Sequence, residues 1–500
     1  MAVNASPALL NGSGGLPLGR LLAYHAARDP RRPALVIGDE TISREQLEAQ
    51  ANRRARMLAA DGVKAGDLVT IALPNGLEFY ETTFALWKLG AIPNVVSHKL
   101  PATEFSTLLA VAQPKMVIGA NLHDLAGHKA VRGGRWLDES LSAEELPEVI
   151  STHWKAMASG GSTGQPKIIV DHMPGLWDPK VTVFGQRLDD VLLNPGPLYH
   201  NAPFVGMHYG LFTGATVVEM GRFDAERALA LVEDRKVGWV NFVPTMMHRI
   251  WRLGSDVRAR FDLASLHTVF HMAAPCPTWL KQAWIDWLGP ERIFELYAGT
   301  ERQGTTLISG TEWLERQGSV GKPQPGSRIR VLDDAGRDCR PGETGEIYFL
   351  PDAGRGTTYH YIGAAPKTLG DWESLGDLGY FDEAGYLYLS DRRTDLILSG
   401  GANIYPAEVE AALGSHPKVN SVIVIGLRDA EWGQRVHAIV ELERGVSLQA
   451  DDLLNHASAH LARYKLPKTF EFVDFPLRDD AGKARRNALR DERAARLPSS

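Results

Sequence analysis

Nine residues in the first half of the chain combine glycines, hydroxyls and a lysine: Ser159-Gly160-Gly161-Ser162-Thr163-Gly164-Gln165-Pro166-Lys167. Glycines let backbone N–H groups approach a ligand closely, hydroxyls add adjustable donors, and a lysine adds a positive charge. These properties favour a loop that holds a triphosphate. The segment is not a P-loop, because Pro166 precedes Lys167 and Ile168 stands where that motif places a magnesium-binding hydroxyl. A plain Ser/Gly surface loop is the alternative.

Four further motifs follow this glycine loop in order. They are Tyr297-Ala298-Gly299-Thr300-Glu301, Ser374-Leu375-Gly376-Asp377, the stretch from Asp391 to Glu408, and Asp480-Ala481-Gly482-Lys483-Ala484-Arg485-Arg486. Each motif alone is weak evidence. The probability that all of them match by chance in this order is the product of the separate probabilities and is therefore small. Together they resemble the adenylate-forming superfamily, which contains acyl-CoA synthetases, peptide-synthetase adenylation domains and beetle luciferases. The resemblance extends from about Leu21 to about Arg490.

The resemblance implies an ATP-dependent acyl-CoA ligase. Such an enzyme joins a carboxylic acid to the α-phosphate of ATP, releases pyrophosphate, and then transfers the acyl group to coenzyme A with release of AMP. Because an anion attacks a polyanion, catalysis consists mainly of charge neutralisation and alignment. The implied cofactors are ATP, magnesium and coenzyme A. An enzyme that loads a carrier protein or a partner enzyme, a luciferase-like oxidase and a non-catalytic acyl-adenylate binding protein are the alternatives.

The same resemblance assigns roles to individual residues. It implies that Lys483 bridges the substrate carboxylate and the α-phosphate, that Glu301 binds magnesium, that Thr163 and Lys167 hold phosphates, and that His200 gates the acyl pocket. These five are the expected catalytic residues. Expected nucleotide contacts are Ser159, Gly160, Gly161, Ser162, Thr163, Gly164, Lys167, Ala273, Ala274, Pro275, Tyr297, Ala298, Gly299, Thr300, Asp377, Arg392 and Lys483. Expected acyl and coenzyme A channel residues are His200, Gly299, Gly400, Gly401 and Asn403.

Three residues depart from the superfamily pattern. Gly160 replaces a hydroxyl of the usual loop, Ile168 replaces its closing glycine, and Thr394 occupies the hinge position where Asp or Lys is usual. A loop of the type Ser-Gly-Gly-Ser-Thr-Gly is similar to that of ligases acting on bulky polycyclic carboxylic acids. The motifs do not identify the acid, because acyl-pocket residues are spread over several loops.

Composition narrows the class of protein further. The chain has 500 residues, 44% hydrophobic and 23% charged, with a formal net charge of −6, which gives no sign of nucleic-acid or anionic-membrane binding. The two cysteines, Cys276 and Cys339, are too few for a disulfide framework. The segment Met1–Gly15 has no basic residue and no long apolar run, so we expect no signal peptide, no membrane span and a cytoplasmic protein. The oligomeric state is open, with a homodimer among the options.

Short β-rich runs alternate with helix-length segments, which predicts an α/β fold with mainly parallel sheets. Residues 68–73 read as a buried strand, and 77–89 as a helix that Gly90 ends. Residues 345–349 and 385–389 read as hairpin strands of a small β-barrel-like unit. The resemblance divides the chain into a large N-terminal domain over 1–391 and a small mobile α+β C-terminal domain over 392–500. Its hinge lies near 391–395, and we expect a loose charged tail from Asp479 onward.

Overall fold

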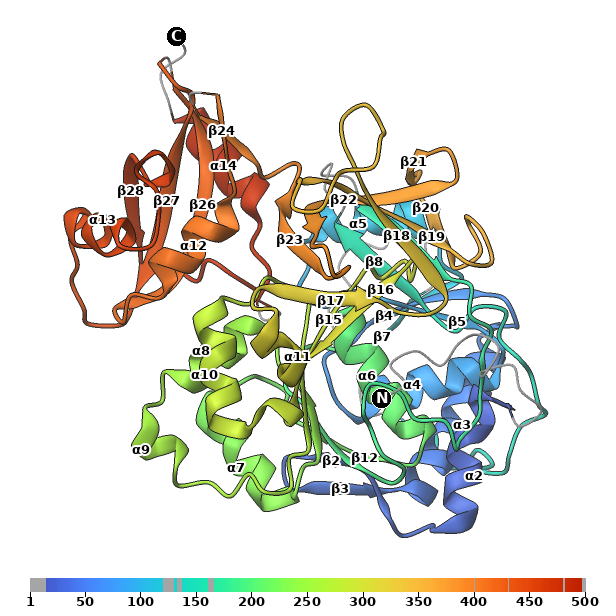
Figure 1. Ribbon diagram of the computed structural model, residues 1–500. Helices are drawn as coiled ribbons and strands as arrows, with labels where there is room; N and C mark the ends of the chain where they lie inside the picture. Colours follow the sequence, from blue (N-terminus) through green and yellow to red (C-terminus); the bar gives the residue numbers. More distant parts are fainter. Residues whose placement is uncertain are drawn as a thin grey trace.

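The computed structural model describes residues 15–119, 130–132, 137–160, 166–399, 401–429, 431–479 and 482–496 (Figure 1). One mainly parallel sheet carries the strands on either side of the glycine loop, in the order β20-β9-β8-β5-β4-β6-β7. Strands β8, β5, β4, β6 and β7 run parallel to one another, whereas β9 pairs antiparallel with both β8 and β20. The bounds are β4 (Leu68–Ala72), β5 (Ile92–Val95), β6 (Met116–Gly119), β7 (Ala130–Arg132), β8 (Ala156–Gly160), β9 (Pro166–Asp171) and β20 (Tyr359–Ile362).

A second, longer sheet has the order β18-β19-β22-β23-β17-β16-β15-β14-β13-β11-β12-β2-β3, with β21 paired to β22. Neighbours are parallel from β2 to β15 and antiparallel from β15 to β18, so the predicted small β unit continues this sheet. The bounds are β2 (Pro33–Ile37), β3 (Glu40–Ser43), β11 (Val191–Asn194), β12 (Thr216–Glu219), β13 (Trp239–Asn241), β14 (Thr268–His271), β15 (Ile293–Ala298), β16 (Thr305–Ser309), β17 (Ser319–Pro323), β18 (Ser327–Leu332), β19 (Gly345–Pro351), β21 (Lys367–Leu369), β22 (Trp372–Phe381) and β23 (Leu387–Arg392). A short pair, β1 (Leu16–Pro17) with β10 (Leu176–Trp177), lies apart.

Helices bury both faces of these sheets. Alternate residues of one strand point to opposite layers, so Val217 joins the core beneath α3, α4 and α6 whereas Val218 joins the core beneath α7, α8 and α10. Helix α5 covers the outer face of the first sheet. The bounds are α2 (Leu21–Arg28), α3 (Arg44–Ala60), α4 (Leu77–Lys88), α5 (Ala102–Ala112), α6 (Asn201–Phe212), α7 (Ala225–Arg235), α8 (Pro244–Trp251), α9 (Ser255–Arg258), α10 (Thr278–Leu288) and α11 (Gly310–Glu315).

The C-terminal part forms its own sheet, with the order β25-β24-β27-β26 and β28 beside β27. It lies to one side of the N-terminal part (Figure 1, upper left). The chain passes from β23 of the long sheet to β24 of the small one through residues 393–396. The bounds are β24 (Ile397–Ser399), β25 (Ala402–Ile404), α12 (Pro406–Gly414), β26 (Val419–Asp429), β27 (Gly433–Leu442), α13 (Ala450–Ser458), β28 (Thr469–Val473) and α14 (Arg486–Ala495).

Two local expectations can be compared with the structure directly. The predicted strand and helix that precede Gly90 are present as β4 and α4, and Gly90 has the φ of +70° that a helix-ending glycine adopts. The expectation of a loose tail is wrong over Arg486–Ala495, which forms α14. Leu489 packs against the C-terminal core, and Arg493 donates to Glu471 at 2.6 and 2.8 Å. The charged composition gave no sign of this helix, because the helix is held mainly by one leucine and by the ion pair of Arg493 with Glu471.

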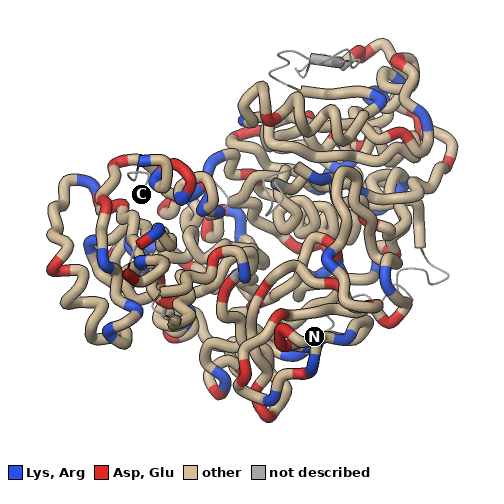
Figure 2. The backbone as a smooth tube through the Cα atoms, turned by 90° about the horizontal axis from the view of Figure 1, so that it is seen from above, with Lys and Arg blue, Asp and Glu red and all other residues tan. Residues whose placement is uncertain are grey.

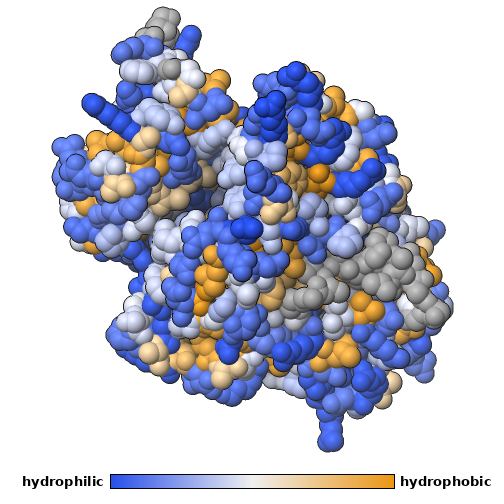
Figure 3. Space-filling view, in the orientation of Figure 1, coloured by the Kyte–Doolittle hydropathy of each residue, from blue (hydrophilic) through white to orange (hydrophobic). Residues whose placement is uncertain are grey.

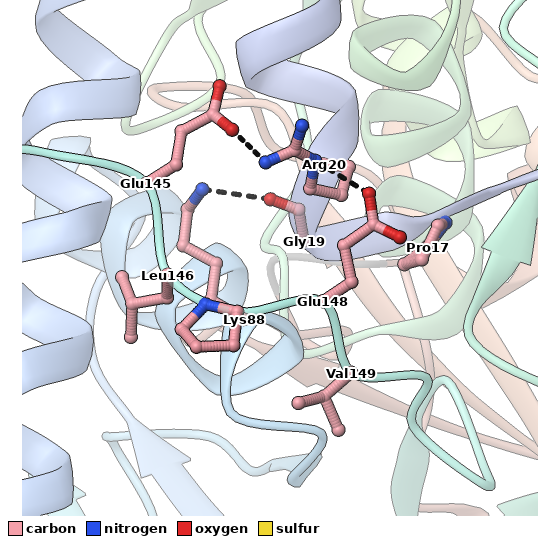
Figure 4. Close-up of a pocket in the computed structure, with 9 residues that line it drawn as sticks. Pro17, Gly19, Arg20, Lys88, Glu145, Leu146, Glu148 and Val149 are labelled. Atoms are coloured by element: carbon pink, nitrogen blue, oxygen red, sulfur yellow. Dashed lines mark hydrogen bonds and ion pairs between the residues drawn. The ribbon is translucent and has the colours of Figure 1, made fainter.

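Basic and acidic residues are interspersed along the described part of the chain (Figure 2). Ion pairs of Arg20 connect the segment before α2 to the residues around 145–149 (Figure 4). Arg20 pairs with Glu145 and Glu148, and the buried Lys88 donates to Gly19 O at 2.8 Å. This contact region holds α4 to the segment before β8 and has a structural role. Within the described ranges, no helix has both the length and the apolar character needed to cross a membrane.

Candidate active site

The glycine loop connects β8 to β9. Ser159 pairs with Lys167 and Gly160 pairs with Pro166 across this hairpin. The loop residues between them, Gly161, Ser162, Thr163 and Gly164, lie outside the described residues, so their phosphate contacts stay predictions.

Ile168 follows the loop and is fully buried in the core beneath α5. It lies opposite Ala158 on β8 and Ile362 on β20. The strand has therefore entered the sheet at this position, and an apolar side chain suits it. This placement gives a physical reason for the departure from the usual closing glycine.

Glu301, the expected magnesium ligand, is buried and faces two side chains from other strands. Lys167 Nζ lies 3.4 Å from Glu301 Oε1, and the Tyr361 hydroxyl donates to the same oxygen at 2.7 Å. Lys167 Nζ also lies 3.8 Å from the centre of the Tyr361 ring, a cation–π distance. Burial and the neighbouring Glu301 raise the pKa of Tyr361, so its hydroxyl keeps the proton that it donates.

Sequence reasoning missed Tyr361. Its strand, β20, pairs with β9 across almost 200 residues of chain, with Tyr361 opposite Ile169. The local sequence Tyr359-His360-Tyr361-Ile362 indicates only a strand, and no local signal identifies its partner. The residues around Glu301 fit magnesium, because a single buried carboxylate beside the lysine expected to bind phosphate leaves coordination positions for phosphate oxygens and water.

The residues expected at adenine and ribose lie together, near the end of β15 and in the middle of β22. The Tyr297 hydroxyl donates to Asp377 Oδ2 at 2.7 Å. Asp377 is the backbone partner of Arg392 on the neighbouring strand β23. Three residues from motifs up to 95 positions apart are thereby brought together, while the Arg392 side chain is outside the described part of the chain.

The segments after β14 and β15 leave the sheet at one edge, because these strands are adjacent and parallel. After β14 come Ala273, Ala274 and Pro275, and Ala273 has a φ of +74°, a conformation that costs an L-residue roughly 1 kcal/mol. After β15 come Gly299 and Thr300, and a Cβ on Gly299 would lie 2.6 Å from Leu375 Cδ1 and 2.8 Å from Glu301 Oε2. A side chain at position 299 would therefore displace the ends of Leu375 and Glu301. Ala298, the last residue of β15, is exposed at this edge.

His200 lies at the same edge, in the turn between β11 and α6. It is the residue immediately before α6 and is half-buried. Its backbone N–H donates to Pro197 O at 3.1 Å, and its ring centre lies 4.7 Å from that of Tyr199. Strands β11, β13, β14 and β15 thus present His200, Thr245, the Ala273 segment and Glu301 at their carboxyl ends, where open α/β sheets bind ligands.

The loop that carries Lys483 reaches this edge from the C-terminal part. Its backbone is closed by Lys483 N–H donating to Asp479 Oδ1 at 2.9 Å and Gly482 N–H donating to Asp479 O at 2.9 Å. Gly482 is buried with a φ of +76°, and a Cβ there would lie 2.4 Å from Thr245 Oγ1 of α8. Only glycine allows this close approach.

Arg252, which immediately follows α8, makes the densest contact between the two parts. Its guanidinium donates to Glu443 at 2.7 and 3.1 Å, to Val419 O at 3.0 Å and to Pro417 O. Arg485 pairs with Glu104 of α5 at 2.9 Å. Figure 3 shows a hollow between the C-terminal part at upper left and the N-terminal part.

The expected channel residues of the C-terminal part do not lie at the sheet edge that the loop of Lys483 reaches. Gly401 and Asn403 belong to the hairpin of β24 and β25, and β24 lies at the end of the C-terminal part away from β15 and β16 (Figure 1). Gly400 is outside the described residues. Thr394 lies in the linker between β23 and β24, and its role as the hinge stays a prediction.

The model of the AMP-binding enzyme family matches residues 22–353, and that of the AMP-binding enzyme C-terminal domain matches residues 408–483. The 2-succinylbenzoate–CoA ligase of Bacillus licheniformis is 31% identical over 483 residues, covering 94% of this chain and 98% of the relative. The fatty acid–[acyl-carrier-protein] ligase ScoC of Streptomyces coeruleorubidus is 30% identical, covering 94% and 95%.

Two solved structures of o-succinylbenzoate CoA synthetase (MenE) from Bacillus subtilis resemble this chain over nearly its whole length. The complex with the acyl-adenylate intermediate OSB-AMP has a TM-score of 0.80 at 28% identity, covering 95% of this chain and 98% of the other. A double mutant bound to the product analogue OSB-NCoA has a TM-score of 0.67 at 28% identity, covering 95% and 99%. Since identity and coverage barely differ, the two TM-scores show only that this chain superposes better on the acyl-adenylate complex than on the complex with the product analogue. The chain belongs to the AMP-binding enzyme family and is an ATP-dependent, AMP-forming acid–thiol ligase.

Proposed function

We propose that the chain activates a ring-bearing carboxylic acid, aromatic or polycyclic, and transfers it to coenzyme A in a cycle that rotates the C-terminal domain about residues 391–395. The observation that carries the residue roles is the gathering of His200, Thr245, Ala273 and Glu301 at one sheet edge, with the loop of Lys483 docked on Thr245. Side chains from distant motifs meet there as the two-step reaction requires.

In the first step, positive charge must be brought to the phosphates that the acid approaches. Lys167 lies beside the glycine loop and supplies one fixed charge, and Lys483 supplies a second, movable one. Glu301 would hold magnesium, which when bound places further positive charge on phosphate oxygens. Tyr361 keeps the Glu301 carboxylate in place through its 2.7 Å hydrogen bond. Asp377, oriented by Tyr297, is in place to accept the ribose hydroxyls, and Tyr297 offers its ring to adenine.

In the second step, a thiol attacks the acyl-adenylate at its carbonyl carbon and AMP leaves. The loop of Lys483 must withdraw, and the face with Gly401 and Asn403 replaces it. His200 stands between the acyl pocket and the path of the thiol. The docked loop supports the first-step arrangement, and the distant β24–β25 hairpin supports a second arrangement reached by rotation.

Aromatic packing behind α6 supports a ring-bearing acid. The Tyr209 ring stacks on Trp177 at 4.4 Å and on Trp154 at 5.3 Å. One turn earlier on the same helix, a Cβ on Gly206 would lie 3.1 Å from Trp239. These rings fill the layer behind the helix that follows His200, and we propose that they limit the depth of the acyl pocket and give it flat walls. Such a pocket suits a ring better than a long alkyl chain.

A panel of acids tests this proposal. Benzoate, 2-succinylbenzoate, cholate, octanoate and palmitate are compared by ATP–pyrophosphate exchange and by coenzyme A-dependent release of AMP. We expect the best ring-bearing acid to exceed palmitate about tenfold or more in kcat/KM, since a few apolar contacts give that discrimination. Palmitate as the best substrate contradicts the ring-bearing class, and exchange without coenzyme A-dependent AMP release favours a carrier-protein acceptor.

We also propose a cytoplasmic location, and a homodimer, which sedimentation would detect.

A further inference from the structure

A hydrogen-bonded network lies directly behind the turn that carries His200. Its centre is Glu219, the last residue of β12, which is buried. Three side chains donate to this carboxylate: the Tyr80 hydroxyl, Asn194 Nδ2 at 2.7 Å and Asn75 Nδ2 at 3.1 Å. The donors come from α4, from β11 and from the segment before α4, so the network joins three parts of the core.

Asn75 extends this network to the turn itself. Its Nδ2 donates to Gly196 O at 2.9 Å, and its Oδ1 accepts from Leu198 N at 2.8 Å. These two contacts bracket Pro197, whose carbonyl accepts the His200 N–H at 3.1 Å. Glu219 is therefore connected to His200 through hydrogen bonds to Asn75, the backbone of residues 196–198, and the hydrogen bond from His200 N–H to Pro197 O.

Other contacts also restrain the turn, since Leu198 is buried in the core and His200 O accepts from Phe204 N at 3.1 Å. Gly196 lacks a side chain, and a Cβ there would lie 3.0 Å from Pro203 Cγ, so the backbone passes close to α6. A further restraint is the Gly196 N–H, which donates to Asn194 Oδ1 at 3.3 Å. Because Asn75 and Asn194 both bind Glu219 as well, one carboxylate holds both side chains that grip the turn. Removing Asn75 would free the two peptides on either side of Pro197.

We infer that Asn75, held by Glu219, is a positioning residue that sets the placement of His200 for the thioester step. This inference rests on the proposed role of His200 in admitting the thiol. Asn75 does not touch the nucleotide residues Tyr297 and Asp377 in the described contacts, so it acts on the second step more than on the first. A displacement of a gating side chain by about 1 Å is sufficient to slow a step substantially.

A double-mutant cycle tests the inference. Asn75→Ala, His200→Ala and the double variant are compared in single-turnover thioester formation, using the acyl-adenylate of the best acid from the panel and coenzyme A. We expect Asn75→Ala to slow this step about tenfold in the otherwise unchanged enzyme and less than twofold in the His200→Ala background, because coupled residues are not additive. Pyrophosphate exchange should change less than twofold. Equal slowing in both backgrounds would overturn the inference.

A control variant and a crystal structure distinguish positioning of His200 from a general loss of stability. Asn52→Ala removes another amide that makes two side-chain contacts, to Glu48 and Ala143 O at 2.8 Å each, and should leave thioester formation unchanged. A crystal structure of Asn75→Ala without substrates should show the Gly196–His200 turn displaced, and an unmoved turn contradicts the inference whatever the activity. If Asn75→Ala does not fold, Glu219→Gln serves instead, since an amide cannot accept from all three donors. Absence of exchange with every acid in the unchanged enzyme would refute the proposed function instead.

Discussion

Replacing Arg252 by alanine should weaken the docked arrangement in which Lys483 reaches the N-terminal part. Arg252 belongs to the N-terminal part, and its contacts to Glu443, Val419 O and Pro417 O all lie in the C-terminal part. The proposed rotation of the C-terminal domain would move all three acceptors away together. The arginine therefore stabilises one arrangement and makes no equal contribution to the other, which is the condition for shifting a two-state equilibrium.

The size of the effect follows from the exposure of the contacts. The Arg252 side chain is 21% exposed and Glu443 is 40% exposed, so solvent screens the ion pair and it contributes about 0.5 kcal/mol. Two hydrogen bonds from a charged donor to carbonyl oxygens add about 1 kcal/mol together after the same discount. A total of about 1.5 kcal/mol corresponds to a shift of about tenfold toward the undocked arrangement.

The assay compares the two half-reactions. Pyrophosphate exchange with the best acid should fall about fivefold to tenfold in Arg252→Ala, whereas thioester formation from a supplied acyl-adenylate should keep its rate or rise. Arg249→Ala is the matched control, because Arg249 is an exposed arginine of α8 itself. Exchange at the wild-type rate, or an equal loss in both half-reactions, would refute the proposed role of the docking contact.

Three other substitutions have distinct expected outcomes. Asp377→Ala should raise KM for ATP by a factor equivalent to about 2–3 kcal/mol, and 2′-deoxy-ATP should lose less in this variant than in the wild type; equal penalties contradict the ribose contact. Glu301→Gln should raise the magnesium concentration for half-maximal exchange about tenfold, because a neutral amide is a poorer ligand, and an unchanged magnesium dependence contradicts the assignment. Thr394→Pro should permit exchange but block acyl-CoA formation, because proline restricts rotation at that residue; acyl-CoA production at the wild-type rate places the pivot elsewhere.

Much of the fold follows from local patterns in the sequence. The alternation of strand and helix signals predicted the parallel sheets, and Gly90 correctly marked the end of α4. The expectation failed at α14, where Leu489 is the apolar anchor among charged residues. A local pattern carries little information when a helix is held mainly by ion pairs such as Arg493 with Glu471.

The residues of the candidate site were likewise only partly predictable from the sequence. Motifs whose residue types match their chemistry, such as Tyr297 and Asp377, were predicted from sequence, and they lie in contact. Residues that act through non-local contacts were missed, including Tyr361 beside Glu301 and Arg252 beside Glu443. A tyrosine in a strand and an arginine after a helix have many structural uses, so only their partners across the fold reveal what they do.

Single-turnover kinetics of Lys483→Ala test the central claim most directly. The claim is that the docked C-terminal loop supplies the charge for adenylation and withdraws before the thioester step. ATP–pyrophosphate exchange should fall by about a thousandfold or more while ATP binding is nearly unchanged, because the charge acts chiefly in the transition state. Thioester formation from a supplied acyl-adenylate should proceed within about twofold of the wild-type rate. Unchanged exchange in Lys483→Ala would contradict the claim.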